Sequence, residues 1–148
     1  MHRTASRRAR GFSLVELLVA TSVSGVLASV AYPSFAGSMH KARRTEAVVA
    51  LMQVQQAEER FRSNGSRYGS LDEIGVASTA AGRHYAITVD SPAAASYVVT
   101  AVARGAQASD AACRHLRISV DATGWTMHSG ASAAVDNDEA ANRRCWNL

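Results

Sequence analysis

The sequence is poor in residues that end helices or cross-link chains, and it holds no recognisable catalytic signature. Of its 148 residues, two are proline, two are cysteine and 6% are aromatic. Neither a G-x-S-x-G motif nor a phosphate-binding glycine loop is present, and Cys113 has no evident neighbouring base that would make it a nucleophile. We therefore expect no enzymatic activity and no cofactor.

Acidic residues are missing from the first ten positions, which contain four arginines (Arg3, Arg7, Arg8 and Arg10). The whole chain has 16 Lys and Arg against 12 Asp and Glu, a net charge of +4. Leaving out the four arginines brings the basic residues to 12, equal to the acidic ones. The positive charge thus belongs to the N-terminal segment, and nucleic acid is an unlikely partner on electrostatic grounds.

A long apolar run follows these arginines. Residues 12–32 contain one charged residue, Glu16. As a helix the run spans about 31 Å, enough to cross a hydrocarbon core of roughly 30 Å. The arginines predict that its N-terminal end stays in the cytoplasm and that the rest of the chain is exported. In the bacterial periplasm, Cys113 and Cys145 can then form a disulfide.

Three kinds of segment fit the apolar run: a secretory signal cut near 29–31, a plain anchor, or a signal cut before the run. Glu16 separates them, because a carboxylate in a membrane-inserted helix is costly and marks a functional residue. Cleavage between Gly11 and Phe12 would create an α-ammonium group four residues before Glu16. That amine can pair with the carboxylate of a neighbouring subunit, so the third kind is favoured.

Residues 10–17, RGFSLVEL, resemble the type III signal of type IV pilins and type II secretion pseudopilins. In that family a peptidase cuts after the glycine, here Gly11, and methylates the new N-terminal phenylalanine, here Phe12. Gly25 and Pro33 fall where the family often has a helix-loosening glycine and a kinking proline. The resemblance implies these assembly residues: Glu16, Gly25 and Pro33.

The predicted organisation has three parts. Residues 1–11 form a cytoplasmic leader that is removed, residues 12–35 a transmembrane and polymerisation helix, and residues 36–148 a periplasmic amphipathic helix with a globular head. Pro33 is expected to kink or interrupt the helix. Beyond it, an apolar stripe predicts a helical face under a sheet, with charged residues such as Glu58 mostly off that face. The stripe comprises Ala47, Val48, Leu51, Met52, Val54 and Phe61.

The predicted fold class is α+β, the type IV pilin fold: a long N-terminal helix packed against a roughly four-stranded antiparallel sheet. The helix is expected to end near Ser63-Asn64-Gly65, and residues 66–82 form a loop with a helical turn near 71–74. The tail 130–148 has little periodicity. The strand candidates, the last two joined by a turn at 121–124, are 85–89, 97–102, 116–120 and 125–128.

The head most resembles minor pilins of the PilE type, in Arg44-Thr45-Glu46-Ala47, the strands at Tyr85 and Tyr97, and Cys113. This implies a structural, minor subunit of a type IV pilus that contributes to pilus biogenesis, adhesion, twitching motility or DNA uptake. Its implied partners are major and minor pilin subunits, the prepilin peptidase and methylase, and the inner-membrane assembly platform. The subunit would reside in the inner membrane before assembly and in the extracellular pilus afterwards.

Two alternatives remain open. A type II secretion pseudopilin shares the N-terminal signal but commonly lacks a C-terminal disulfide, so Cys113 and Cys145 favour the pilus. A DNA-receptor pilin of a competence pilus would need a basic surface that bears aromatic residues. The single candidate segment for such a surface is Arg143-Arg144-Cys145-Trp146.

Metal sites are disfavoured. The five histidines (His2, His40, His84, His115 and His128) show no paired ligand spacing on one element, although His115 and His128 would meet across a hairpin in one register. Asp136, Asp138 and Glu139 form an acidic cluster that lacks the glycine and the ligand count of an EF-hand loop. We expect a solvated loop there rather than a calcium site.

Overall fold

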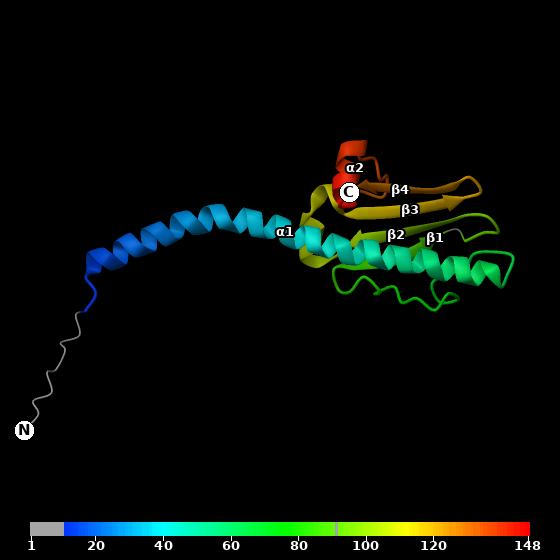
Figure 1. Cartoon of the computed structure of the whole chain (residues 1–148), viewed down its shortest axis with the longest axis horizontal. Coiled ribbons are helices and arrows are strands. Elements are labelled where there is room, and N and C mark those ends of the chain that lie inside the picture. The colour runs from blue at the N-terminus through cyan, green and yellow to red at the C-terminus, as the bar shows by residue number, and fades with distance from the viewer. Residues whose placement is uncertain (1–10, 91) are drawn as a thin grey trace, which may run out of the picture. The chain divides into compact units, whose positions relative to one another are not determined.

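The computed structural model describes residues 11–90 and 92–148, apart from the side chains at positions 32 and 33. Its contacts divide the chain into two units, Met1–Gly37 and Ser38–Leu148, and each is described by itself. The elements in chain order are α1 (Leu14–Ser63), β1 (Tyr85–Asp90), β2 (Tyr97–Ala103), the 3-10 helices η1 (Gly105–Ser109) and η2 (Ala111–Cys113), β3 (His115–Asp121), β4 (Gly124–Gly130) and α2 (Glu139–Cys145) (Figure 1).

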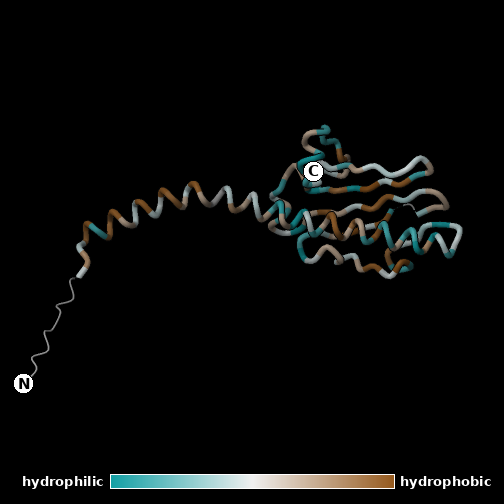
Figure 2. The backbone as a smooth tube through the Cα atoms, in the orientation of Figure 1, coloured by the Kyte–Doolittle hydropathy of each residue, from teal (hydrophilic) through white to brown (hydrophobic). Residues whose placement is uncertain are grey.

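The described part of the N-terminal unit is almost entirely helical and exposes its apolar side chains. The first part of α1 is long and apolar enough to cross a membrane, and its hydrophobic positions follow one another closely (Figure 2). The hydroxyls of Thr21, Ser22 and Ser29 donate to carbonyls of the preceding helical turn. Because these hydroxyls are satisfied within the helix itself, the segment carries few polar groups that need water.

The helical backbone continues across position 33 and ends at Ser63. The expected end near residues 63–65 is confirmed. Of the two effects expected of Pro33, an interruption of the helix is wrong, and a kink stays a prediction. A proline inside a helix removes one backbone donor and crowds the preceding turn, at a cost of about 3 kcal/mol, and the helix of 50 residues nevertheless continues through it.

The part of α1 within the second unit has one buried face, which packs against the sheet. Ala47, Leu51 and Val54 are buried as predicted, and Phe61 is half-buried. Met52 was expected on this face but is exposed. Glu58 was expected off it but is completely buried. The stripe was therefore placed correctly along its centre and incorrectly at its edges.

The sheet has the order β1-β2-β3-β4, and all three strand pairs are antiparallel. All four predicted strands and the α+β class are confirmed. One row across the sheet joins Val89, Val99, Ile118 and Met127. This row belongs to the face that forms the hydrophobic core together with α1, because alternate residues of a strand point to the same side.

The C-terminal tail contains a short helix that its lack of periodicity did not predict. In α2, the side chain of Asp138 accepts a hydrogen bond from the backbone N–H of Ala141 at 2.7 Å, an N-cap. Cys145, at the end of α2, and Trp146 are buried in the core. Seven residues are too short to show an apolar repeat, so only the cap residue and the arginines of the last turn signalled this helix.

Candidate functional site

The predicted processing site lies at the N-terminal start of α1. Phe12 is 85% exposed, and Glu16 lies in the first turn of the helix. A carboxylate in a first turn interacts favourably with the helix dipole. Phe12 lies two residues before α1, and the predicted cleavage before it would create an amine four residues from Glu16. The four arginines of the leader lie outside the described residues.

Gly25 lies within the apolar part of α1, where its Cα faces open space. A Cβ built at this position would meet no atom within 4 Å. Glycine inside a helix lowers its stability relative to alanine by roughly 0.5–1 kcal/mol. Gly25 therefore has no packing role within the described subunit, and its predicted role in assembly stays a prediction, as does that of Pro33.

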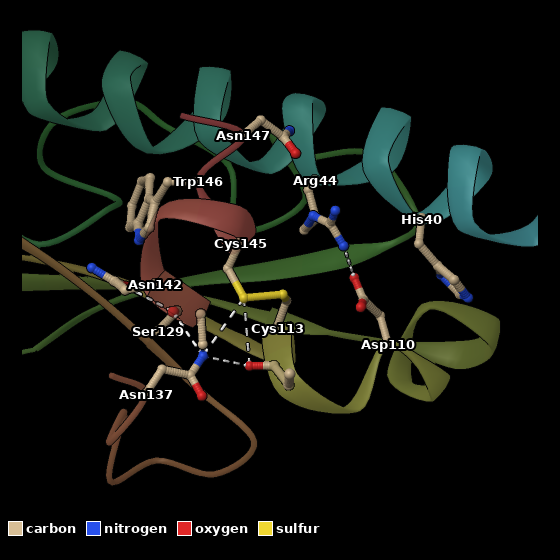
Figure 3. Close-up of a disulfide and its surroundings, with 12 residues drawn as sticks. His40, Arg44, Asp110, Cys113, Ser129, Asn137, Asn142, Cys145, Trp146 and Asn147 are labelled. Atoms are coloured by element: carbon tan, nitrogen blue, oxygen red, sulfur yellow. Dashed lines mark hydrogen bonds and ion pairs between the residues drawn. A yellow bond between two sulfur atoms is a disulfide. The ribbon is translucent and has the colours of Figure 1, made fainter. Parts of the chain in front are cut away.

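The head holds the disulfide that was predicted between Cys113 and Cys145. Its Cα atoms are 5.3 Å apart, and the two residues are separated by 32 positions. Cys113 ends η2, and Cys145 ends α2. The bond therefore fastens the C-terminal helix to the segment between β2 and β3 (Figure 3).

A network of amide and hydroxyl groups surrounds this disulfide. The Asn137 amide donates to the Ala112 carbonyl at 2.8 Å and to the Ser129 hydroxyl at 2.9 Å. The Ser129 hydroxyl donates to the side-chain oxygen of Asn142 at 2.7 Å, and the Asn142 amide donates to the carbonyl of Met127 at 2.8 Å (Figure 3). These bonds tie the loop before α2, and α2 itself, to the edge strand β4.

Gly130 allows the tail to turn back against β4. A Cβ at this position would lie 2.6 Å from the Cα of Val135, a distance that side chains do not tolerate. Val135 itself has a φ of 50°, which is uncommon for a β-branched residue. The turn that leads into α2 thus depends on the missing side chain of Gly130.

A groove of about 600 Å³ is formed by α1, α2 and the C-terminal residues. Its basic side chains come from both helices: Lys41 and Arg44 from α1, and Arg143 and Arg144 from α2. We call this surface the α1–α2 groove. Asn147 stabilises it, because its side-chain amide donates to the Lys41 carbonyl at 3.3 Å and to the Thr45 hydroxyl at 3.1 Å. The remaining lining residues are Ala140, Asn147 and Leu148.

One of the four cations is committed to the fold. Arg44 is buried, and its Nη1 donates to Asp110 at 2.6 Å. Gln107 is fully buried on η1 and donates from Nε2 to Asp110 and to the Tyr85 hydroxyl, both at 3.1 Å. Burial raises the pKa of Tyr85 to about 12. The His40 ring lies 3.0 Å from the Gln107 side-chain oxygen. This network joins α1 to the segment after β2.

The candidate segment Arg143-Arg144-Cys145-Trp146 is only partly available for binding. The two arginines are exposed in the α1–α2 groove, whereas Trp146 is 3% exposed and its indole N–H donates to the His128 carbonyl at 3.3 Å. Trp146 therefore packs in the core and offers no stacking surface.

The other candidate sites do not gather into clusters. Within residues 11–90 and 92–148, no three His, Cys, Asp or Glu side chains are placed to hold a metal ion. Asp138 of the acidic cluster caps α2. His115 lies opposite Gly130 and His128 opposite Arg117, so the two histidines are diagonal neighbours on one face of the hairpin and not a directly opposed pair.

Glu58 is a buried carboxylate that the sequence did not reveal. Its Oε2 accepts the backbone N–H of Gly69 at 2.9 Å, and burial raises its pKa. Among the described residues, neither its Oε1 nor the buried Tyr97 hydroxyl has a hydrogen-bond partner. The negative charges of Glu59 and Glu73 raise the pKa further. Glu58 thus holds the loop after α1 at an electrostatic cost.

This cost predicts a pH dependence of head stability. A raised pKa in the folded state means that the folded head binds more protons, so its free energy of unfolding falls as the pH rises from about 4.5 through the folded pKa. We expect Glu58→Gln to remove this fall and to stabilise the head at neutral pH by on the order of 1 kcal/mol. Chemical denaturation of the full chain in detergent, at acidic and neutral pH, measures both effects.

The exposed Glu46 offers the matched control. Glu46→Gln should leave the pH dependence of the wild-type head unchanged. If Glu58→Gln instead lowers the free energy of unfolding at neutral pH, the contacts of the charged carboxylate stabilise the head by more than its burial destabilises it, and the prediction is wrong.

Comparisons with known proteins match two family profiles to this chain. The profile described as "Type IV minor pilin ComP, DNA uptake sequence receptor" matches residues 33–117, more than half of the chain. The profile "Prokaryotic N-terminal methylation motif" matches residues 6–32. The two matches meet between residues 32 and 33, so together they cover both the apolar helix and most of the head.

Individual relatives match over less than half of the chain. Type II secretion system core protein G of Pectobacterium carotovorum subsp. carotovorum is 35% identical over 66 residues, 45% of this chain and 42% of that protein. Type IV major pilin protein PilA of Myxococcus xanthus (strain DK1622) is 35% identical over 71 residues, 47% of this chain and 32% of that protein. Core protein G of Klebsiella pneumoniae is 34% identical over 67 residues, 45% of this chain and 48% of that protein.

Proposed function

Because the chain belongs to the type IV minor pilin family described as ComP, DNA uptake sequence receptor, we propose that it is a minor subunit of a type IV pilus. The observation that carries this proposal is the combination of a pilin-like head with an exposed apolar helix whose first part lies within the match to the N-terminal methylation motif. An exposed apolar helix is unstable in water, so it needs a bilayer or a bundle of similar helices around it.

The proposed life cycle has two stages. The subunit first resides in the inner membrane with its leader in the cytoplasm and its head in the periplasm. After cleavage between Gly11 and Phe12 and methylation of Phe12, it leaves the bilayer for a fibre with other pilin subunits. Its matches to core protein G keep a secretion pseudopilus as the alternative. The minor-pilin profile and the Cys113–Cys145 disulfide favour the pilus.

Substitution of Gly11 tests the processing step. Glycine has no side chain, so a membrane peptidase can approach the backbone before Phe12 closely. We expect Gly11→Val to leave a full-length precursor in the membrane, which intact-mass measurement detects as a chain that retains residues 1–11. The matched control is Gly25→Val, which lies beyond the cleavage site. Normal cleavage of Gly11→Val would contradict the proposed site.

A second candidate function is reception of DNA at the fibre, which the family description and the α1–α2 groove favour together. The cations of the groove suit phosphate groups, although the charge balance of the chain without its four N-terminal arginines gave no such indication. We expect Arg143→Gln/Arg144→Gln to lower the affinity of the purified chain for duplex DNA by tenfold or more, and to lower the salt dependence of binding. Equal binding by wild type and variant would remove the groove from this role.

A further inference from the structure

We propose that the α1–α2 groove binds anionic phospholipid headgroups while the subunit waits in the inner membrane. The inference rests on the proposed membrane residence of residues 12–35. Beyond the proposed function, it assigns to the head a binding site for anionic lipid headgroups, which is occupied before the subunit enters the fibre.

The charges of the groove are largely uncompensated. Two ion pairs occur among the described residues, Arg44–Asp110 and Arg67–Glu73. Lys41, Arg143 and Arg144 therefore line the groove without an ionic partner there, and all three are exposed. Three free cations around one concave surface fit a ligand that carries a phosphate.

The covalent chain keeps one cation of the groove, Lys41, close to the bilayer. Phe35, which is 66% exposed, is the last residue of the predicted membrane segment 12–35, and Lys41 follows six residues later in the same helix. Six helical residues rise about 9 Å. The headgroup layer extends roughly 5–8 Å beyond the hydrocarbon core on each side, and the Debye length at physiological salt is about 8 Å. Lys41 is therefore held within reach of the headgroups wherever the rest of the head points.

The rim of the groove also suits a lipid surface. Leu148 lines the groove and is 70% exposed, so it offers an apolar contact beside the cations. The tether raises the effective concentration of headgroups at the groove, and a ligand in solution has no such advantage. Each cation near an anionic surface contributes about fivefold to binding. Lipid is thus the favoured occupant before assembly, and extraction into the fibre would free the groove.

Nanodiscs that contain the full chain test this proposal through amide hydrogen exchange of residues 139–148. One set of discs contains phosphatidylcholine alone, and the other about 30% phosphatidylglycerol. We expect exchange in this segment to be about tenfold slower in the anionic discs, and the difference to vanish at about 0.5 M salt. Arg143→Gln/Arg144→Gln should reduce the difference to less than about twofold. The control Arg83→Gln/Arg104→Gln, at exposed arginines outside the groove, should preserve it.

The possible failures are distinguishable. A chain that is retained in both kinds of disc but exchanges equally in them overturns the lipid site and leaves membrane residence intact. A chain that neither disc retains overturns both proposals. If short duplex DNA slows exchange of the same residues in phosphatidylcholine discs and phosphatidylglycerol does not, the groove is a nucleic-acid site and the lipid proposal is wrong.

Discussion

Replacement of Glu16 by valine is expected to give a cleaved, membrane-resident subunit that fails to enter fibres. In a bundle of apolar helices, an unpaired charge costs several kcal/mol. The amine on Phe12 needs a partner there, and Glu16 is the single acidic residue between Phe12 and Glu46. Cleavage should survive, because recognition of the signal is attributed to Gly11 and the leader arginines.

Immunoblots of sheared fibres and of membranes measure this effect. We expect the fibre fraction of Glu16→Val to fall more than tenfold while the membrane fraction persists. Glu46→Gln is the matched control, because it removes a carboxylate from the exposed side of α1 within the head. Wild-type amounts of Glu16→Val in sheared fibres would show that this carboxylate does not drive assembly.

Loss of the disulfide is expected to have the largest effect on the head itself. Opening a loop of 32 positions increases the chain entropy of the unfolded state, an effect worth about 3–4 kcal/mol. Cys113→Ser should lower the free energy of unfolding of the oxidised head by that amount. It should also expose Trp146, because α2 loses its covalent attachment.

Chemical denaturation of the full chain in detergent, followed by tryptophan fluorescence in a Trp125→Phe background that leaves Trp146 as the single tryptophan, measures both changes. The double variant Cys113→Ser/Cys145→Ser and the reduced wild type are the controls, and both should match the single variant. Equal stability of the wild type with and without reductant would show that the bond contributes nothing. Loss of the disulfide should also disturb the α1–α2 groove, because α2 presents Arg143 and Arg144.

The sequence predicted those parts of the fold that have a strong periodic or compositional signal. The strands around Ile87, Val99 and Ile118 are rich in β-branched and aromatic residues, and each was placed within two residues of its observed ends. The apolar run predicted the first half of α1, and the small hydrophilic residues after Ser63 predicted where the helix ends. The cysteine pair was predicted from the exported location.

Features that depend on tertiary contacts escaped prediction. Glu58 and Gln107 are polar and completely buried, and only the positions of Gly69 and Tyr85 in space explain why. The α1–α2 groove joins Lys41 to Arg144 across about a hundred residues of sequence, so no local pattern reveals it. Trp146 was predicted to share a binding surface with the neighbouring arginines, but its side chain is buried in the core. Two of the four residues of that candidate surface, Cys145 and Trp146, are therefore buried and unavailable for binding.

The most direct test of the proposed function is the N-terminal peptide of the protein recovered from sheared fibres. Mass spectrometry should find a peptide that begins at Phe12 and carries one methyl group on its amine, because the proposed life cycle places cleavage and methylation before assembly. The arginine-rich leader should be absent from this fraction. An N-terminus at Ala31 or Tyr32, or an uncleaved chain within the fibres, would contradict the assignment of this protein as a processed pilin subunit.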